Sequence, residues 1–176
     1  LGMFFKALFF IFGTNPFVYG LGSGVISRFK ENAPPKDLSM KKLSLFQSAS
    51  GLRNLVRIGD IFNKRQEHGI MVLEGLRNAP GIILPKISSL TKPVFNRLPL
   101  LFEDTNRLSS MQNKLWAQGI ETSRMYLRPL HHVFKLGYAK NDFPNAVYVA
   151  SHLLTLPIHP GLSYIDIQRM INIIRG

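Results

Sequence analysis

The chain of 176 residues is 45% apolar and 18% charged, a composition that suits one globular domain and excludes a disordered chain. It contains no cysteine, which excludes disulfides, thiolate nucleophiles and cysteine-ligated metals. The net charge of +12 comes from 22 basic and only 10 acidic residues, and no basic run exceeds two residues, so a solvated basic surface is favoured over a nucleic-acid site.

The first twelve residues, LGMFFKALFFIF, are apolar except for Lys6. As a helix they would extend about 18 Å, which is short of a hydrocarbon core of roughly 30 Å. Two interpretations stay open: a helix buried against something else, and a helix lying in a membrane interface. We expect residues 1–42 to form an apolar N-terminal segment and linker, and the protein to be cytoplasmic, with weak membrane association through residues 1–12 as an alternative. Because the chain begins at Leu1, we expect a fragment or a processed product.

Apolar residues at spacings of three and four predict a long helix over residues 44–76, broken or kinked near one of its glycines. Residues 81–87 and 94–102 are then two candidate strands. Pro99 directs the second of these strands to a sheet edge or a bulge, because proline donates no ladder hydrogen bond.

A helix follows over residues 104–118, with Asp104 or Thr105 as its cap. Residues 120–127 are the third candidate strand. The next helix is expected over residues 144–154, where Pro144 suits the first turn.

Residues 155–160 are expected to be extended, and an amphipathic helix over residues 163–175 closes the chain. Ser163 and Asp166 have the spacing of a capping box at its start. The order of these elements predicts an α+β fold, in which a small antiparallel sheet of about three strands is flanked by helices and preceded by the long helix.

Three stretches in this order resemble the DegT/StrS group of PLP-dependent sugar aminotransferases. GIETSRMYLRPLHHVF (119–134) is similar to a stretch of the group in which an arginine, a tyrosine and a Pro-Leu-His triplet recur. DFPNAVYVASHLLTLPIHPGL (142–162) is similar to its F-P-x-A helix and the L-P-x-x-P-x-L motif that follows. LSLFQSASGLRNL (43–55) is similar to its helix of the type L-x-x-x-Q-A-A-x-G-L-x-x-L.

The resemblance covers roughly residues 43–175 and implies that residues 43–176 are the small C-terminal domain of a fold-type I aminotransferase. For the complete enzyme it implies PLP as cofactor, a sugar nucleotide as substrate and a homodimer. The group's Schiff-base lysine normally precedes the long helix, and no lysine in residues 1–42 stands in a matching context. We therefore expect no PLP on this chain, no catalytic residue within it and no transaminase activity of the chain alone.

Arg124, Tyr126 and His131 occupy the positions that, by this resemblance, help to receive the sugar nucleotide. A guanidinium suits bidentate contact with phosphate, while tyrosine and histidine suit hydrogen bonds to hydroxyls. The structural alternative is that Tyr126 packs within a strand and His131 binds a backbone carbonyl. We expect residues 123–134 to turn at Pro129 and to present Arg124 and His131 on an accessible edge.

The histidines do not predict a metal site, because adjacent imidazoles do not converge easily on one ion. His132 and Arg128 are expected to be solvated. The alternative class of function is a non-enzymatic basic module that binds a membrane surface or nucleic acid. Its support is limited to the charge and the apolar N-terminus, so the aminotransferase interpretation, without nucleic acid as a partner, is preferred.

Overall fold

The computed structural model describes residues 42–176. The chain divides into two compact units, Leu1–Ser44 and Leu45–Gly176, and the helices and strands of the described residues all lie in the second unit. The apolar segment over residues 1–12 lies outside the described residues. The expected domain boundary between residues 42 and 43 stays a prediction.

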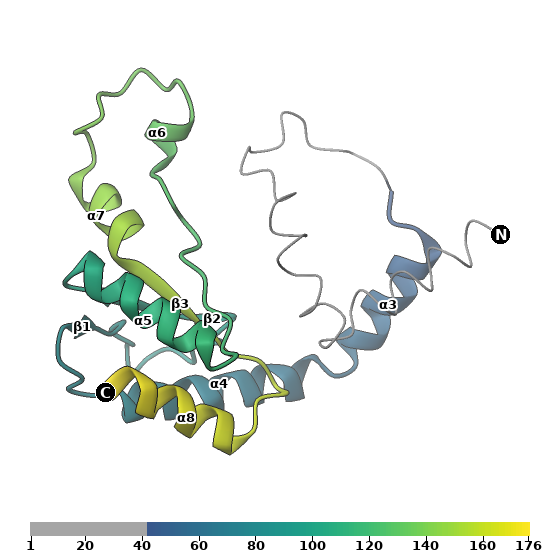
Figure 1. Ribbon diagram of the computed structural model, residues 1–176. Helices are drawn as coiled ribbons and strands as arrows, with labels where there is room; N and C mark the ends of the chain where they lie inside the picture. The colour runs from purple at the N-terminus through teal and green to yellow at the C-terminus, as the bar shows by residue number, and fades with distance from the viewer. Residues whose placement is uncertain (1–41) are drawn as a thin grey trace. The chain divides into compact units, whose positions relative to one another are not determined.

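The unit Leu45–Gly176 contains six helices and three strands, which confirms the α+β class (Figure 1). In chain order they are α3 (Leu45–Leu55), α4 (Ile58–Gly75), β1 (Ile82–Ile83), β2 (Arg97–Phe102), α5 (Thr105–Ala117), α6 (Leu130–Val133), α7 (Pro144–His152), β3 (Leu153–Pro157) and α8 (Tyr164–Arg175).

The sheet is antiparallel throughout, with the order β1-β2-β3. Ile82 pairs with Phe102, and Leu100 pairs with Leu154. The expectation of a small three-stranded antiparallel sheet is confirmed.

β2 lies at the centre of the sheet, so the expectation that Pro99 directs this strand to a sheet edge is wrong. The central position tolerates a proline because β1 pairs only with Leu101 and Phe102, and Pro99 has its strand partner, Thr155, on the β3 side alone.

The third strand is not the one that the sequence suggested. Residues 120–127 contribute only an isolated bridge between Ser123 and Thr155, whereas β3 supplies the strand. Two residues after that bridge, Met125 takes a left-handed backbone conformation with φ of 44°, which ends the extended segment. The expected helix over 144–154 accordingly stops at His152, and the apolar run after it becomes β3.

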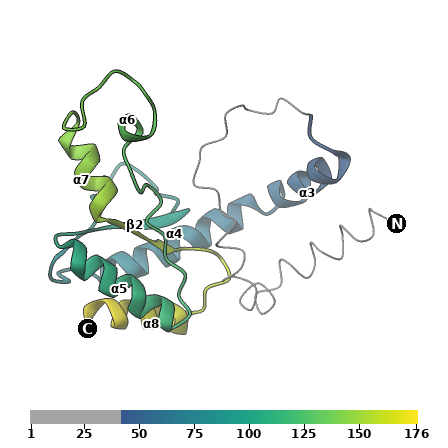
Figure 2. The same cartoon turned by 45° about the horizontal axis from the view of Figure 1, so that its top comes forward.

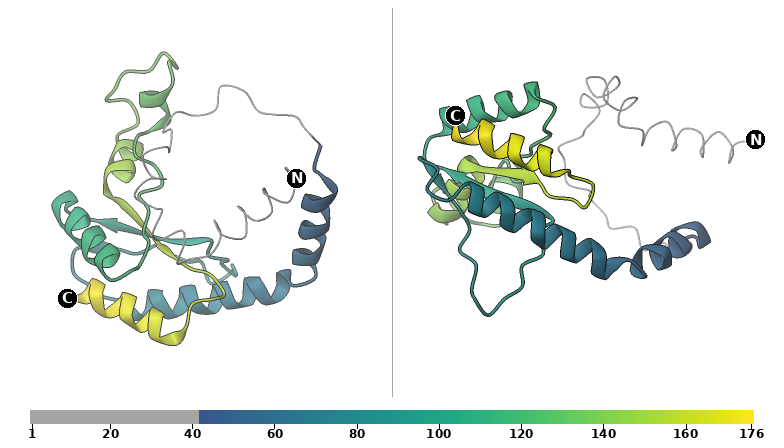
Figure 3. Two further views of the ribbon diagram at one scale, coloured as in Figure 1. Left: turned by 45° about the vertical axis from the view of Figure 1, so that its right-hand side comes forward. Right: turned by 90° about the horizontal axis from the view of Figure 1, so that it is seen from below.

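The long helix expected over residues 44–76 is broken into α3 and α4 at Val56 and Arg57, two residues before Gly59. None of the residues of α3 is buried, whereas α4 buries Gly69 and Val72. Helix α4 lies alongside α8, as both views in Figure 3 show.

The core forms where β2 and β3 meet α4, α5 and α8. Residues of β2 alternate between half-buried and buried, so Leu98, Leu100 and Phe102 point to one face, which the helices cover. Burying each such side chain stabilises the fold by about 1.5–3 kcal/mol relative to exposure. The other fully buried members include Val72, Leu76, Leu108, Leu115, Leu154, Leu156 and Ile174.

The helix starts are those that the sequence predicts. The Asp104 side chain accepts a hydrogen bond from the Asn106 amide, and Pro144 is the first residue of α7. Ser163 and Asp166 form the reciprocal capping box of α8. Each cap satisfies or removes backbone N–H groups that have no partner within the helix.

Candidate substrate-binding segment

The segment that carries the candidate residues is attached to the sheet at Ser123. Its amide donates to the carbonyl of Thr155 at 3.2 Å, and the Thr155 amide donates to the Ser123 carbonyl at 2.8 Å. The Thr155 hydroxyl also donates to the Ser123 carbonyl, at 2.9 Å. Residue 123 therefore extends the sheet beside β3 by one residue.

Arg124 is held by the end of α7. One terminal guanidinium nitrogen donates to the carbonyl of Ser151 at 2.7 Å, and this carbonyl lies in the last turn, where helical partners are missing. The Nε atom of Arg124 is buried without a hydrogen-bond partner. Arg124 is thus half-buried and bound to backbone, which differs from the expected position on an open edge.

Tyr126 lies next to the left-handed Met125 and is 58% exposed. It does not pack within a strand, because the sheet pairing of this segment is limited to Ser123. More than half of the residue is therefore accessible to water.

His131 lies in α6, which Pro129 directly precedes as N-cap. Its Nε2 is 3.4 Å from the carbonyl of Lys140, and Nε2 of His132 is 2.8 Å from the same oxygen. The His131 ring also contacts Phe143 edge-on, with centroids 5.3 Å apart. His131 therefore has the backbone contact of the structural alternative.

His132 was expected to be solvated, and this expectation is wrong. The residue is half-buried and makes the shorter of the two hydrogen bonds to Lys140. The cause is the return of the chain at residue 140, a contact that no local pattern in the sequence reveals. The short helix α6 was also not predicted.

Residues 124–143 form one loop, here called the basic loop, which extends away from the sheet in Figures 1 and 2. It holds Arg124, Arg128, Lys135 and Lys140 against one acidic residue, Asp142. It also exposes large apolar and aromatic side chains, namely Met125, Tyr126, Leu127, Leu130, Val133, Phe134, Leu136, Tyr138 and Phe143.

Such a combination of cations, aromatic faces and hydrogen-bonding groups suits an anionic ligand that carries a flat ring. Arg124 and His131 bind different stretches of backbone, at Ser151 and Lys140. The three candidate residues therefore belong to one loop but are held by separate contacts.

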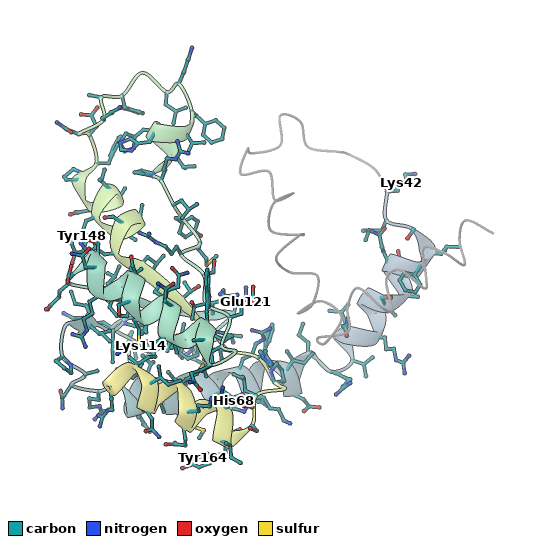
Figure 4. All side chains as sticks on the ribbon, viewed as in Figure 1. Lys42, His68, Lys114, Glu121, Tyr148 and Tyr164 are labelled. Carbon is teal, nitrogen blue, oxygen red and sulfur yellow. The ribbon has the colours of Figure 1, made fainter. Side chains whose placement is uncertain are left out.

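Two further residues contact this segment and were not predicted from the sequence, namely Arg97 and Thr155. The Arg97 Nε donates to the Thr155 hydroxyl at 2.9 Å, and an Arg97 terminal nitrogen donates to the carbonyl of Glu121 at 3.3 Å. Glu121, labelled in Figure 4, lies at the start of the attached segment. The available signal was Thr155 itself, a hydroxyl within the apolar run LLTLP.

The described residues do not fit a covalent PLP site. A lysine that holds PLP must lie in a pocket with the cofactor. Each lysine of residues 42–176 is instead exposed, namely Lys42, Lys64, Lys86, Lys92, Lys114, Lys135 and Lys140. Within residues 42–176, three or more His, Asp or Glu side chains nowhere gather as a metal site would require. In the same part of the chain, the helices are too short or too polar to cross a bilayer.

A model of the DegT/DnrJ/EryC1/StrS aminotransferase family matches residues 27–175. The chain belongs to this family. The match includes the motif-bearing stretch from Gly119 to Leu162 and the basic loop within it. The match begins before Leu43, the first residue of the motif LSLFQSASGLRNL.

The chain is also similar to proteins of Methanocaldococcus jannaschii and Streptomyces venezuelae. An uncharacterized protein of Methanocaldococcus jannaschii is 31% identical over 137 residues, which are 73% of this chain and 35% of that protein. The dTDP-3-amino-3,4,6-trideoxy-alpha-D-glucose transaminase of Streptomyces venezuelae is 33% identical over 108 residues, 58% of this chain and 27% of that enzyme. The chain thus spans about a third of the length of these relatives.

The fold is that of solved sugar aminotransferases. The crystal structure of S. venezuelae DesV in complex with a ketimine intermediate is 25% identical and has a TM-score of 0.70. The similarity covers 83% of this chain and 40% of DesV. The small antiparallel sheet and its helices are therefore one part of a larger fold-type I enzyme in these relatives.

Proposed function

We propose that the chain is the C-terminal part of a PLP-dependent sugar-nucleotide aminotransferase, and that its basic loop contacts the sugar nucleotide. The family match over residues 27–175 carries this proposal. The S. venezuelae relative is named as a transaminase of a dTDP-linked amino sugar. This name supports a sugar nucleotide as the class of substrate.

The chemistry of the loop agrees with such a ligand. Tyr126 is an exposed residue, and its hydroxyl is able to donate to a phosphate or sugar oxygen. Arg124 supplies a positive charge, and its guanidinium has further N–H groups beyond the one that Ser151 accepts. His131 is held at Lys140 with its ring beside Phe143, so it presents an aromatic edge as well as a hydrogen-bonding group.

The amino transfer itself belongs to the complete enzyme. There, PLP supplies the electron sink for the transfer, and the lysine that holds it would come from outside residues 42–176. We propose that the chain alone is inactive and that the complete enzyme is a cytoplasmic homodimer. Borohydride treatment after incubation with PLP, followed by mass spectrometry, tests the first point; label on one specific lysine would contradict it.

The substrate proposal is tested by titrating the 176-residue chain with thymidine diphosphate while recording NMR spectra. We expect weak binding, with a Kd of ~1 mM, and the largest shift changes in residues 124–143. Tyr126→Phe should weaken binding about threefold or more by removing one hydroxyl. Tyr164→Phe, at a 64% exposed tyrosine on α8, is the matched control and should leave the Kd unchanged.

Shift changes that are confined to other regions would contradict the proposed role of the loop. The same holds for equal effects of the two tyrosine substitutions. His131→Gln and Arg124→Lys then separate the contributions of the imidazole and the guanidinium, since each variant keeps hydrogen-bonding ability but changes its geometry.

A further inference from the structure

The hydroxyl of Thr155 lies at a junction of three chain segments. Thr155 is 2% exposed, and its Oγ1 accepts from Arg97 Nε and donates to the Ser123 carbonyl, both at 2.9 Å. A threonine hydroxyl has one donor and can accept as well, so both functions are used. β2, β3 and residues 121–123, here called the loop root because they directly precede the basic loop, therefore meet at the buried hydroxyl of Thr155.

Arg97 attaches the loop root at a second point. It is the first residue of β2 and pairs with Pro157, so Thr155 is its diagonal neighbour across the two strands. Its Nε binds Thr155 and its terminal nitrogen binds the Glu121 carbonyl. Because the guanidinium is planar, these two bonds fix residues 121 and 155 relative to each other.

From these contacts we infer that Arg97 and Thr155 are positioning residues for the basic loop, an inference that rests on the proposed function. They hold residues 121–123 against β3, and the chain changes direction at Met125 directly afterwards. The direction of the backbone at Ser123 therefore determines where Tyr126 points. Ligand contacts require placement within about 0.5 Å, and the side-chain bonds of Arg97 and Thr155 add to the two backbone hydrogen bonds between Ser123 and Thr155.

The neighbouring Thr122 provides a matched control. It is also buried, at 3% exposed, but its Oγ1 has no hydrogen-bond partner. Replacing either threonine by valine removes one hydroxyl and keeps the shape of the side chain. Only the Thr155 substitution, however, deprives Arg97 and Ser123 of a partner.

The test measures amide hydrogen exchange by NMR and the Kd for thymidine diphosphate in the full chain. In Thr155→Val we expect exchange of the Ser123 amide to rise about tenfold and the Kd to rise about threefold or more, with exchange in α8 unchanged. Thr155→Ser, which keeps the hydroxyl, and Thr122→Val should both stay close to wild type. Arg97→Lys should reproduce the Thr155→Val pattern, because an ammonium lacks the planar fork.

Unchanged Ser123 exchange in both Thr155→Val and Arg97→Lys would overturn the inference. So would an equal rise in α8, since the two residues would then act on general stability. A Thr155→Ser variant that behaves like valine would show that the hydroxyl is not responsible. If wild type binds no nucleotide, the proposed function fails, and exchange at Ser123 relative to α8 still decides whether the two residues position the loop.

Discussion

The guanidinium of Arg65, in α4, donates to the carbonyl of Ile158 at 2.5 Å, although 93 residues separate the two in sequence. The same nitrogen is 3.1 and 3.0 Å from the carbonyls of Phe95 and Asn96. One side chain therefore ties α4 both to the residues before β2 and to the turn after β3. Such hydrogen bonds satisfy carbonyls that lie outside regular pairing.

We expect Arg65→Gln to lower the free energy of unfolding by about 2 kcal/mol, because charged hydrogen bonds to backbone are lost and carbonyls are left without a donor. Urea denaturation followed by far-UV circular dichroism measures the change. Arg53→Gln, at an exposed arginine of α3, is the control and should cost less than about 0.5 kcal/mol. Equal losses in the two variants would contradict the role of Arg65.

A second prediction concerns two glycines of α4. A Cβ at Gly69 would overlap the Phe95 ring, whereas a Cβ at Gly59 has no atom within 4 Å. Gly69→Ala should therefore destabilise the fold by about 1–3 kcal/mol through overpacking. Gly59→Ala should stabilise it by about 0.5–1 kcal/mol, because alanine loses less backbone entropy in a helix. Thermal unfolding of both variants tests the opposite signs, and a stabilising Gly69→Ala would refute the contact.

The capping box of α8 predicts a pH dependence. Hydrogen bonds from the Ser163 hydroxyl and amide lower the pKa of Asp166 below its ordinary value of 3.8. A carboxylate with a lowered pKa adds stability above the unfolded-state pKa, and this stability is lost as the pH falls through the folded-state pKa. Wild type should therefore exceed Asp166→Asn in Tm at pH 6. The difference should begin to shrink as the pH falls below 3.8 and vanish only below the folded-state pKa.

Glu67→Gln, at an exposed acid of α4, serves as the comparison for Asp166→Asn. Its Tm should follow wild type over the same pH range. A difference between wild type and Asp166→Asn that persists at the lowest pH would show that the carboxylate charge is not the cause.

A fourth prediction joins Arg65 to His159. Partial burial lowers the pKa of His159 below its ordinary value of 6.5, and the charges of Arg65 and His68 lower it further. The unfolded chain therefore binds the proton more readily, and stability falls as the pH drops from 6.5 through the folded-state pKa. NMR titration should show the His159 pKa rise in Arg65→Gln and stay in place in Arg53→Gln; no rise would contradict the charge effect.

The sequence by itself determined the local features. The starts of α5, α7 and α8 could be predicted because Asp104, Pro144 and the Ser163–Asp166 pair act on backbone groups within three residues of themselves. The α+β class followed from the order of periodic segments. The family was recognisable from motifs whose residues are close together in the chain.

The tertiary structure alone decided the third strand and the attachment of the site. Leu153–Leu156 are buried on both sides of the sheet, and a continuous apolar run does not distinguish such a strand from the end of a helix. The partners of Thr155 are Arg97 and Ser123, which lie 58 and 32 residues away in the chain. Closing loops of this length costs chain entropy, and the burial and hydrogen bonds made at the junction offset that cost. These contacts therefore form only when β2, β3 and the loop root come together.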